Sequence, residues 1–239
     1  MDEDGKRQPA TVGSPQGAVI SPLLANIYLH YVFDLWARQW WRRQASGNML
    51  IVRYADDTVV GFEHRSDAER FLEELRVRIA EFALELHPDK TRLIEFGKRA
   101  AANRAARKEG KPETFDFLGF THICGRSRRG YFLLHRHTRR KTMLGKLAEV
   151  KEDLRRRRHQ SIPEQGTWLG QVVRGFIQYF GVPTNSKALV SFRYHVSVLW
   201  YRALRRRSQK DKTTWEKMDR LRRAFLPPPR LCQPWPARA

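Results

Sequence analysis

Long apolar runs and cysteines are scarce in this 239-residue chain. No stretch approaches the roughly 18 consecutive apolar residues of a membrane-spanning helix. Residues 1–13, MDEDGKRQPATVG, also lack the apolar centre of a secretory signal. Cys124 and Cys232 are too few and too far apart for a disulfide framework. We therefore predict a soluble protein of the reducing cytoplasm with no membrane partner.

Acidic residues are scarce in the second half of the chain. Residues 1–125 contain 18 Lys and Arg and 18 Asp and Glu, whereas residues 126–239 contain 28 and 7, so the whole net charge of +21 lies there. This asymmetry indicates a polyanionic partner bound along the C-terminal part. Nucleic acid is favoured over an anionic membrane surface, because the basic segments carry scattered aromatic residues and lack one clean lipid-binding face.

Two adjacent acids, Asp56 and Asp57, stand between two apolar runs in residues 49–62, MLIVRYADDTVVGF. Residues 49–52 and 58–60 have the β-branched, apolar character of buried strands, which predicts a tight hairpin with both acids in its turn. Adjacent ionised carboxylates repel each other, and Mg²⁺ would remove that cost because it commonly binds one or two carboxylates together with substrate phosphates. The alternative is an ordinary surface turn, since Asp favours turns.

A helix is predicted before this hairpin. The turn-rich loop of residues 13–17 leads to Ser21 as an N-cap and Pro22 at the first helical position. Residues 23–44 are mostly apolar and end in basic residues, which predicts a buried helix with a favourable charge at its C-terminus.

A second helix is predicted after the hairpin. Ser66 and Glu69 have the spacing of a capping box, and apolar residues recur at helical spacing as far as residue 86. The sequence HPD then breaks this helix and leads into a short strand over residues 92–96. The order helix, hairpin, helix, strand predicts an α+β fold with helices on one face of an antiparallel sheet.

Residues 97–114 are charged and Ala-rich, which predicts a mobile basic insertion that is helical at most in part. Residues 115–120 alternate as a strand, and residues 131–135 are its expected partner across the turn at 125–130. A domain boundary follows near Arg139.

The remainder of the chain has an all-helical pattern. The expected helices span residues 141–158, 168–180, 187–207 with Ser186 as N-cap, and 215–225. The three consecutive prolines at 227–229 end the structured part. We therefore predict an α+β domain over residues 1–138, a basic helical domain over 139–226, and a loose Pro-rich tail over 227–239.

Four ordered motifs carry a family resemblance: GSPQGAVISP, YADD, LELHPDKT and FDFLGF. In this order and spacing they resemble the palm of a reverse transcriptase, specifically that of bacterial group II intron-encoded reverse transcriptase/maturases. The resemblance runs from about Ala10 to at least Phe225, because the basic helices look like the thumb, or maturase, domain of that family. It implies a partial palm followed by a helical thumb/maturase domain.

The resemblance also implies a function, which is Mg²⁺-dependent nucleotidyl transfer to a DNA primer from dNTPs on an RNA template. It implies catalytic roles for Asp56, Asp57 and Lys90, with Asp56 and Asp57 as the Mg²⁺ ligands. It implies template or nucleotide contacts for Gly13, Pro15, Gln16, Gly17 and Tyr54, and a primer grip at Phe117, Leu118 and Gly119. It implies binding of the template–primer duplex and the intron RNA by Arg139, Arg140, Lys141, Arg155, Arg156, Arg157 and Arg158.

One element of the family pattern has no counterpart in the sequence. Polymerases of this kind draw another metal-binding Asp from a strand well upstream of the PQG loop, and Asp2, Glu3 and Asp4 lie in a polar leader without a strand. We therefore expect an N-terminally truncated chain with little activity alone, or one completed by an N-terminal fragment that supplies this Asp. The alternative is a maturase remnant that binds intron RNA and assists splicing without catalysis.

A structural zinc site is a further alternative. His122 and Cys124 alternate on one predicted strand, and His135 and His137 alternate on its partner. If all four side chains face one side of the sheet, they supply the ligand types that zinc prefers.

Overall fold

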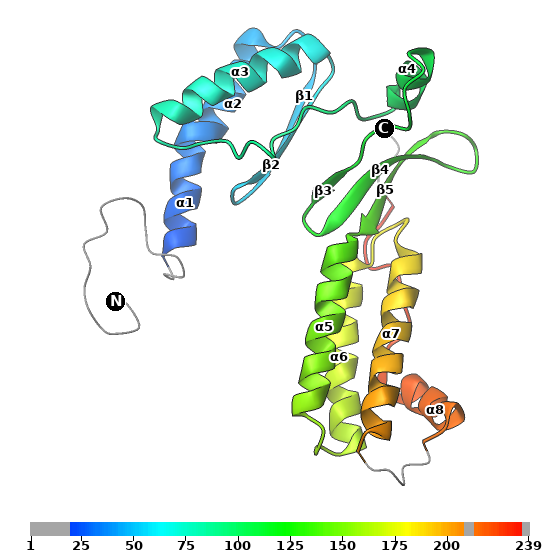
Figure 1. The fold of residues 1–239 in the computed structure, drawn as a ribbon. Coiled ribbons are helices and arrows are strands. Elements are labelled where there is room, and N and C mark those ends of the chain that lie inside the picture. The colour runs from blue at the N-terminus through cyan, green and yellow to red at the C-terminus, as the bar shows by residue number, and fades with distance from the viewer. Residues whose placement is uncertain (1–19, 208–212, 236–239) are drawn as a thin grey trace, which may run out of the picture. The chain divides into compact units, whose positions relative to one another are not determined.

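The computed structural model describes residues 20–207 and 213–235, which form two compact units divided between Ile94 and Glu95 (Figure 1). The fold class is α+β, as predicted, with two small antiparallel sheets and a helical C-terminal part. The division differs from the predicted boundary near Arg139, because it groups the second sheet with the helices that follow it. None of the helices in the described ranges combines the length and apolarity that crossing a membrane requires.

The described part of the first unit contains a continuous helical stretch made of three segments. These are α1 (Ser21–Leu29), the π-helical turn η1 (His30–Asp34) and α2 (Leu35–Gln44). The predicted N-cap is wrong by one residue, because Ser21 is already helical and Ile20 precedes it without a side-chain cap. The prediction of a buried helix is also wrong for α1, which buries none of its residues, whereas η1 and α2 contribute to the core.

A two-stranded hairpin and one long helix complete this unit. β1 (Met49–Tyr54) pairs with β2 (Asp57–Phe62) in antiparallel register, which confirms the predicted hairpin. Two details of that prediction are wrong: Asp57 is the first residue of β2 and not part of the turn, and the strands are not fully buried, because Leu50 and Val52 are exposed. The helices α2 and α3 (Arg65–Glu81) cover one face of it (Figure 1). The core between them consists of Phe33, Ala37, Trp40, Met49, Phe71, Leu75 and Ile79.

The predicted capping box of α3 is wrong. The helix begins at Arg65, and Asp67 in its first turn points inward, where its Oδ2 accepts hydrogen bonds from the Ser46 amide and hydroxyl, both at 2.8 Å. The helix also ends at Glu81 rather than near residue 86, because Ala83 has a left-handed backbone (φ 53°). No strand forms over residues 92–96; Phe96 instead packs on Phe115, with ring centroids 5.0 Å apart.

The second unit opens with the short helix α4 (Ala100–Ala106) and a three-stranded sheet. The strands are β3 (Phe115–Phe117), β4 (Phe120–Arg126) and β5 (Phe132–Thr138), in the order β3-β4-β5. The prediction of one strand over residues 115–120 is wrong, because the chain reverses at Leu118 and Gly119, whose φ angles are 48° and 76°. The predicted partner therefore pairs with β4 and not with β3.

The sheet register excludes the zinc site. His135 lies opposite Ile123 and His137 opposite Thr121, so these two side chains share a face with Thr121 and Ile123. His122 and Cys124 project from the other face. Across residues 20–207 and 213–235, no group of three or more His, Cys, Asp or Glu side chains could hold a metal ion.

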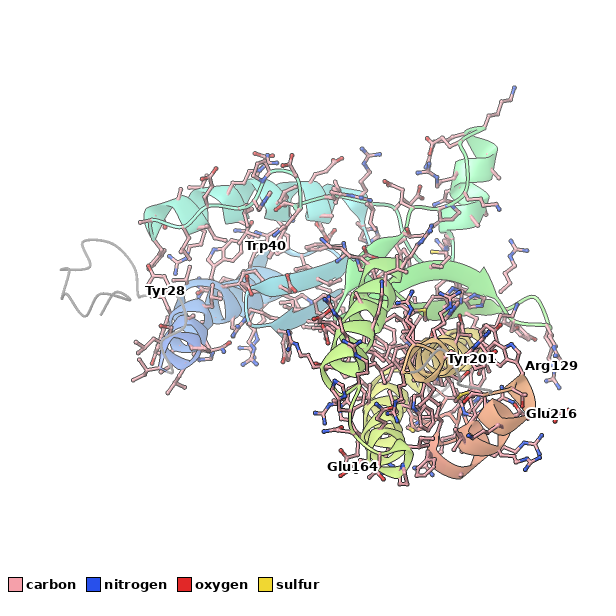
Figure 2. All side chains as sticks on the ribbon, turned by 60° about the horizontal axis from the view of Figure 1, so that its bottom comes forward. Tyr28, Trp40, Arg129, Glu164, Tyr201 and Glu216 are labelled. Atoms are coloured by element: carbon pink, nitrogen blue, oxygen red, sulfur yellow. The ribbon has the colours of Figure 1, made fainter. Side chains whose placement is uncertain are left out.

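Four helices follow the sheet: α5 (Arg140–Arg156), α6 (Ile162–Phe180), α7 (Ser186–Arg205) and α8 (Trp215–Phe225). The predicted start of α6 at 168 is wrong, because Ser161 and Glu164, the latter labelled in Figure 2, form a capping box that begins the helix earlier. The N-cap of α7 is Asn185 and not the predicted Ser186. The Asn185 side chain forms hydrogen bonds with Thr138 at the end of β5.

The helices share one apolar core and hold part of the C-terminal segment. Trp200, Phe192 and Leu169 are among the fully buried side chains of this core. The segment after α8 differs from the predicted loose tail, because the amides of Cys232 and Gln233 donate to the Gly181 carbonyl at 2.6 and 3.1 Å. The end of α6 is thereby joined to this segment.

Candidate functional site

Two acidic side chains stand at the tip of the first hairpin. Tyr54 pairs with Asp57, and Ala55 and Asp56 form the two-residue turn between the strands. We call Ala55, Asp56 and Asp57 the carboxylate turn. Asp56 and Asp57 are both exposed, and no hydrogen bond or ion pair within the described residues reaches either carboxylate. The turn therefore presents four free carboxylate oxygens to solvent.

The hairpin has one open and one covered face. Tyr54 and Asp57 form a cross-strand pair and therefore project from the same face. Leu50 and Val52 alternate onto this face too, and all three side chains of β1 on it are exposed, Tyr54 by 64%. An apolar and aromatic surface thus leads directly to Asp57.

On the covered face, Arg53 connects the carboxylate turn to the first helical stretch. Its Nε and Nη2 donate to the two carboxylate oxygens of Asp34 at 2.8 and 2.6 Å, and its Nη1 donates to the Ala55 carbonyl at 2.8 Å. The hydrogen bond from Arg53 lowers the pKa of Asp34 despite the opposing effect of its partial burial. The pair is therefore ionised at neutral pH.

This pair was not predicted from the sequence, although the sequence contains a signal for it. Arg53 follows Met49 and Ile51 at a spacing of two, which places a charge on the face predicted to be buried. A buried guanidinium requires an acid, and Asp34 is the single acid between residues 5 and 55. Strand periodicity combined with charge counting could have predicted the contact.

No hydrogen bond or ion pair within the described residues joins Lys90 to the carboxylate turn. Lys90 lies in an exposed turn in which the amides of Lys90 and Thr91 donate to the His87 carbonyl. The side chain of Lys90 makes no hydrogen bond or ion pair within the part of the chain that the structure describes. The predicted loop residues Gly13, Pro15, Gln16 and Gly17 lie outside the described residues.

The predicted primer grip coincides with the turn between β3 and β4. Both turn residues, Leu118 and Gly119, have positive φ, which is the backbone of a type I′ hairpin turn and is strained for leucine. The Tyr179 hydroxyl donates to the Leu118 carbonyl at 3.0 Å, and the Arg139 amide donates to the Gly119 carbonyl at 2.9 Å. The end of α6 and the start of α5 therefore hold this turn in a defined position.

Comparison with protein families supplies the decisive observation for the chemistry. The model of the family described as "Reverse transcriptase (RNA-dependent DNA polymerase)" matches residues 1–122, which is just over half of the chain. The chain belongs to the reverse transcriptase family. A search of curated proteins found no match. The family acts on a nucleic acid template and primer with dNTPs, so these are the general substrates that the family assigns to the chain.

The reverse transcriptase match includes the carboxylate turn, Lys90 and the turn at residues 118 and 119. It ends within β4 and leaves the helices α5 to α8 outside. The family match therefore covers the first hairpin and the turn that follows Phe117. It does not cover the basic helices, whose proposed role depends on their own side chains.

The predicted RNA-binding residues form two groups at opposite ends of α5. Arg139, Arg140 and Lys141 are at its beginning, and Arg155 to Arg158 are at its end, about 22 Å away at 1.5 Å per residue. At the beginning, Arg139 makes an ion pair with Asp116 at 2.7 Å. The helix thus presents two separate basic groups instead of one.

The group at the end of α5 is itself divided. Arg155 and Arg156 are largely exposed and make only long ion pairs, 3.8 to 3.9 Å, with Glu152 and Asp153. The Arg157 guanidinium instead lies 4.8 Å from the centre of the Trp168 ring, and its carbonyl accepts a hydrogen bond from Gln165. Arg155, Arg156 and the exposed Arg158 are therefore available to an anionic partner, whereas Arg157 joins α5 to α6.

Proposed function

We propose that the chain acts in RNA-directed DNA synthesis as a group II intron-type reverse transcriptase/maturase, with the carboxylate turn as its nucleotidyl-transfer site. The observation that carries this proposal is the pair of exposed carboxylates, Asp56 and Asp57, which have no partner among residues 20–207 and 213–235 and lie in a segment that matches the reverse transcriptase family. A merely structural Asp–Asp turn would gain from pairing these charges with nearby cations, and Arg53 beside them is committed to Asp34.

The donors of the carboxylate turn fit Mg²⁺. They are hard carboxylate oxygens that have no partner in the part of the chain that the structure describes, and this ion commonly takes one or two carboxylates together with substrate phosphates. In this proposal Asp56 and Asp57 hold the ion, which supplies charge stabilisation at the transferring phosphate and lowers the pKa of the attacking hydroxyl.

In this proposal the other predicted site residues orient the substrates. Tyr54 and the open face beside Asp57 contact the primer end and the incoming nucleotide. Lys90 binds the triphosphate or gives a proton to the departing pyrophosphate, as a general acid does. The turn at Leu118 and Gly119 supports the primer strand, and Gly13, Pro15, Gln16 and Gly17 support the template and the nucleotide.

Primer extension tests the polymerase assignment. We expect the full chain to incorporate dNTPs on a primed RNA template when Mg²⁺ is present, and to stop when EDTA removes the metal. A palm fragment carrying the upstream Asp of this family should raise the rate of incorporation, because a further carboxylate would help to hold the metal ions of a two-metal site. Incorporation that is equal with Mg²⁺ and with EDTA would count against the proposal.

A second candidate function, intron RNA binding without catalysis, is favoured by one observation. The excess positive charge of the chain lies entirely in residues 126–239, and the exposed arginines at the end of α5 have only long ion pairs. Phosphate contacts from such groups bind RNA through backbone and shape, without requiring the carboxylate turn.

Charge removal tests this second function. The triple variant Arg155→Gln, Arg156→Gln, Arg158→Gln should weaken binding to a structured intron RNA and reduce the slope of log K against log salt by roughly one unit per lost phosphate contact. A matched triple variant at the exposed Arg42, Arg43 and Arg76 of the first unit removes the same charge. Equal loss in both variants would mean that only net charge matters and would contradict a binding surface at α5.

A further inference from the structure

Arg53 is a charged side chain on the apolar, covered face of the first hairpin. Its neighbours on that face, Met49 and Ile51, pack into the helical core, and the Arg53 side chain itself is only 14% exposed. Burying a guanidinium is unfavourable unless its donors are satisfied. A largely buried Arg53 is therefore expected to have specific hydrogen-bond partners.

The guanidinium contacts two parts of the unit at once. One edge forms a bidentate pair with Asp34, whose side chain is 21% exposed. The remaining nitrogen, Nη1, donates to the Asn26 side chain at 2.9 Å and to the Ala55 carbonyl at 2.8 Å. Arg53 thus connects α1 and η1 to the backbone of the carboxylate turn.

The hydrogen bond to the Ala55 carbonyl acts on the backbone that carries Asp56. Ala55 has φ 52°, a left-handed conformation that residues with a Cβ adopt mainly where the surroundings enforce it. Its carbonyl and the Asp56 amide belong to one planar peptide group. Fixing this carbonyl therefore fixes the orientation of the backbone from which the Asp56 side chain projects.

Asp34 is itself placed by an irregular helical turn. It is the last residue of the π-helical turn η1, and π-helical turns occur often at functional sites. His30, at the start of this turn, approaches the same carboxylate, with Nδ1 3.4 Å from Oδ2. The inserted residue rotates the helix beyond it, so the position of Asp34 depends on this turn.

We propose that Arg53, oriented by Asp34, is the positioning residue of the carboxylate turn and sets the direction of Asp56 through the Ala55 carbonyl. This inference rests on the proposed function, in which Asp56 takes part in nucleotidyl transfer. An arginine is needed because its planar fork can hold both Asp34 oxygens and still donate to a third group. Lysine, with one ammonium group, retains the charge without that geometry.

The full chain with Arg53→Lys tests the proposal. We expect it to fold, and the ¹⁵N order parameter of the Asp56 amide to fall from about 0.85 to below about 0.6. We also expect Mn²⁺, a spectroscopic substitute for Mg²⁺ measured by electron paramagnetic resonance, to bind about tenfold more weakly. The control Arg76→Lys, which alters an exposed ion pair with Glu73 on α3, should change neither quantity.

An Asp56 amide that keeps its wild-type shift and order parameter in folded Arg53→Lys protein would overturn the proposal. If that variant does not fold, Asp34→Asn provides the same comparison, because it retains the shape and one acceptor oxygen; it should give an intermediate loss of order, and no loss overturns the proposal. Failure of the wild-type chain to bind Mn²⁺ counts against the proposed function, whereas the amide measurement decides the positioning role independently.

Discussion

Replacing Asp56 by Asn is expected to lower Mg²⁺-dependent dNTP incorporation by about 100-fold or more. Asn retains the shape of Asp but not the negative charge that would hold the ion. The substitution should leave the free energy of unfolding within about 0.5 kcal/mol of wild type, because the exposed carboxylate has no partner among the described residues to lose. A large loss of activity without a loss of stability is the expected signature of a catalytic residue.

The measurement is primer extension on an RNA template, combined with thermal unfolding with and without Mg²⁺. Mg²⁺ should raise the Tm of the wild type and have a smaller effect on Asp56→Asn, because a ligand stabilises only the protein that binds it. Asp89→Asn is the matched control, since Asp89 is an exposed acid in a turn of the same unit. Wild-type incorporation by Asp56→Asn would remove Asp56 from the proposed mechanism.

Local sequence patterns predicted the hairpin that carries this site. The runs before and after the two acids are apolar and rich in β-branched residues, so the pairing of the two strands follows from nearby residues alone. The bounds of the helix over 215–225 were also predicted, and they are set by nearby residues: the Thr214 hydroxyl accepts a hydrogen bond from the Lys217 amide, and three prolines follow soon after the end of the helix. The hairpin and this helix depend mainly on residues close to them in the sequence.

Other features depend on tertiary contacts and could not be predicted locally. Leu118 has little intrinsic preference for a positive φ. The turn there is held by Tyr179, at the end of α6, and by Arg139, which directly follows β5. The zinc prediction failed for a related reason: both pairs of residues alternate correctly, but the register between β4 and β5 decides which pairs share a face. Sequence spacing within each strand does not contain that information.

Replacing Trp200 by Ala is expected to destabilise the second unit by about 3–5 kcal/mol. Trp200 has no exposed surface, and it packs against Phe225 of α8 with ring centroids 5.9 Å apart. Its Nε1 donates to the Gln165 side chain at 3.0 Å, and Gln165 in turn donates to the Arg157 carbonyl at 2.6 Å. The substitution leaves a cavity and a buried amide oxygen without its donor, in a unit whose total stability is of the order of 5–15 kcal/mol.

Urea unfolding followed by circular dichroism at 222 nm measures this loss, and Trp200→Phe should recover part of it by refilling the cavity. Trp215→Ala is the matched control: Trp215 is 51% exposed and stacks on Tyr201 of α7, labelled in Figure 2, so its removal should cost less than about 1.5 kcal/mol. Because Gln165 also holds the Arg157 carbonyl at the end of α5, Trp200→Ala should weaken RNA binding once the unit begins to unfold. A loss below about 1 kcal/mol would mean that α6, α7 and α8 do not depend on a common core.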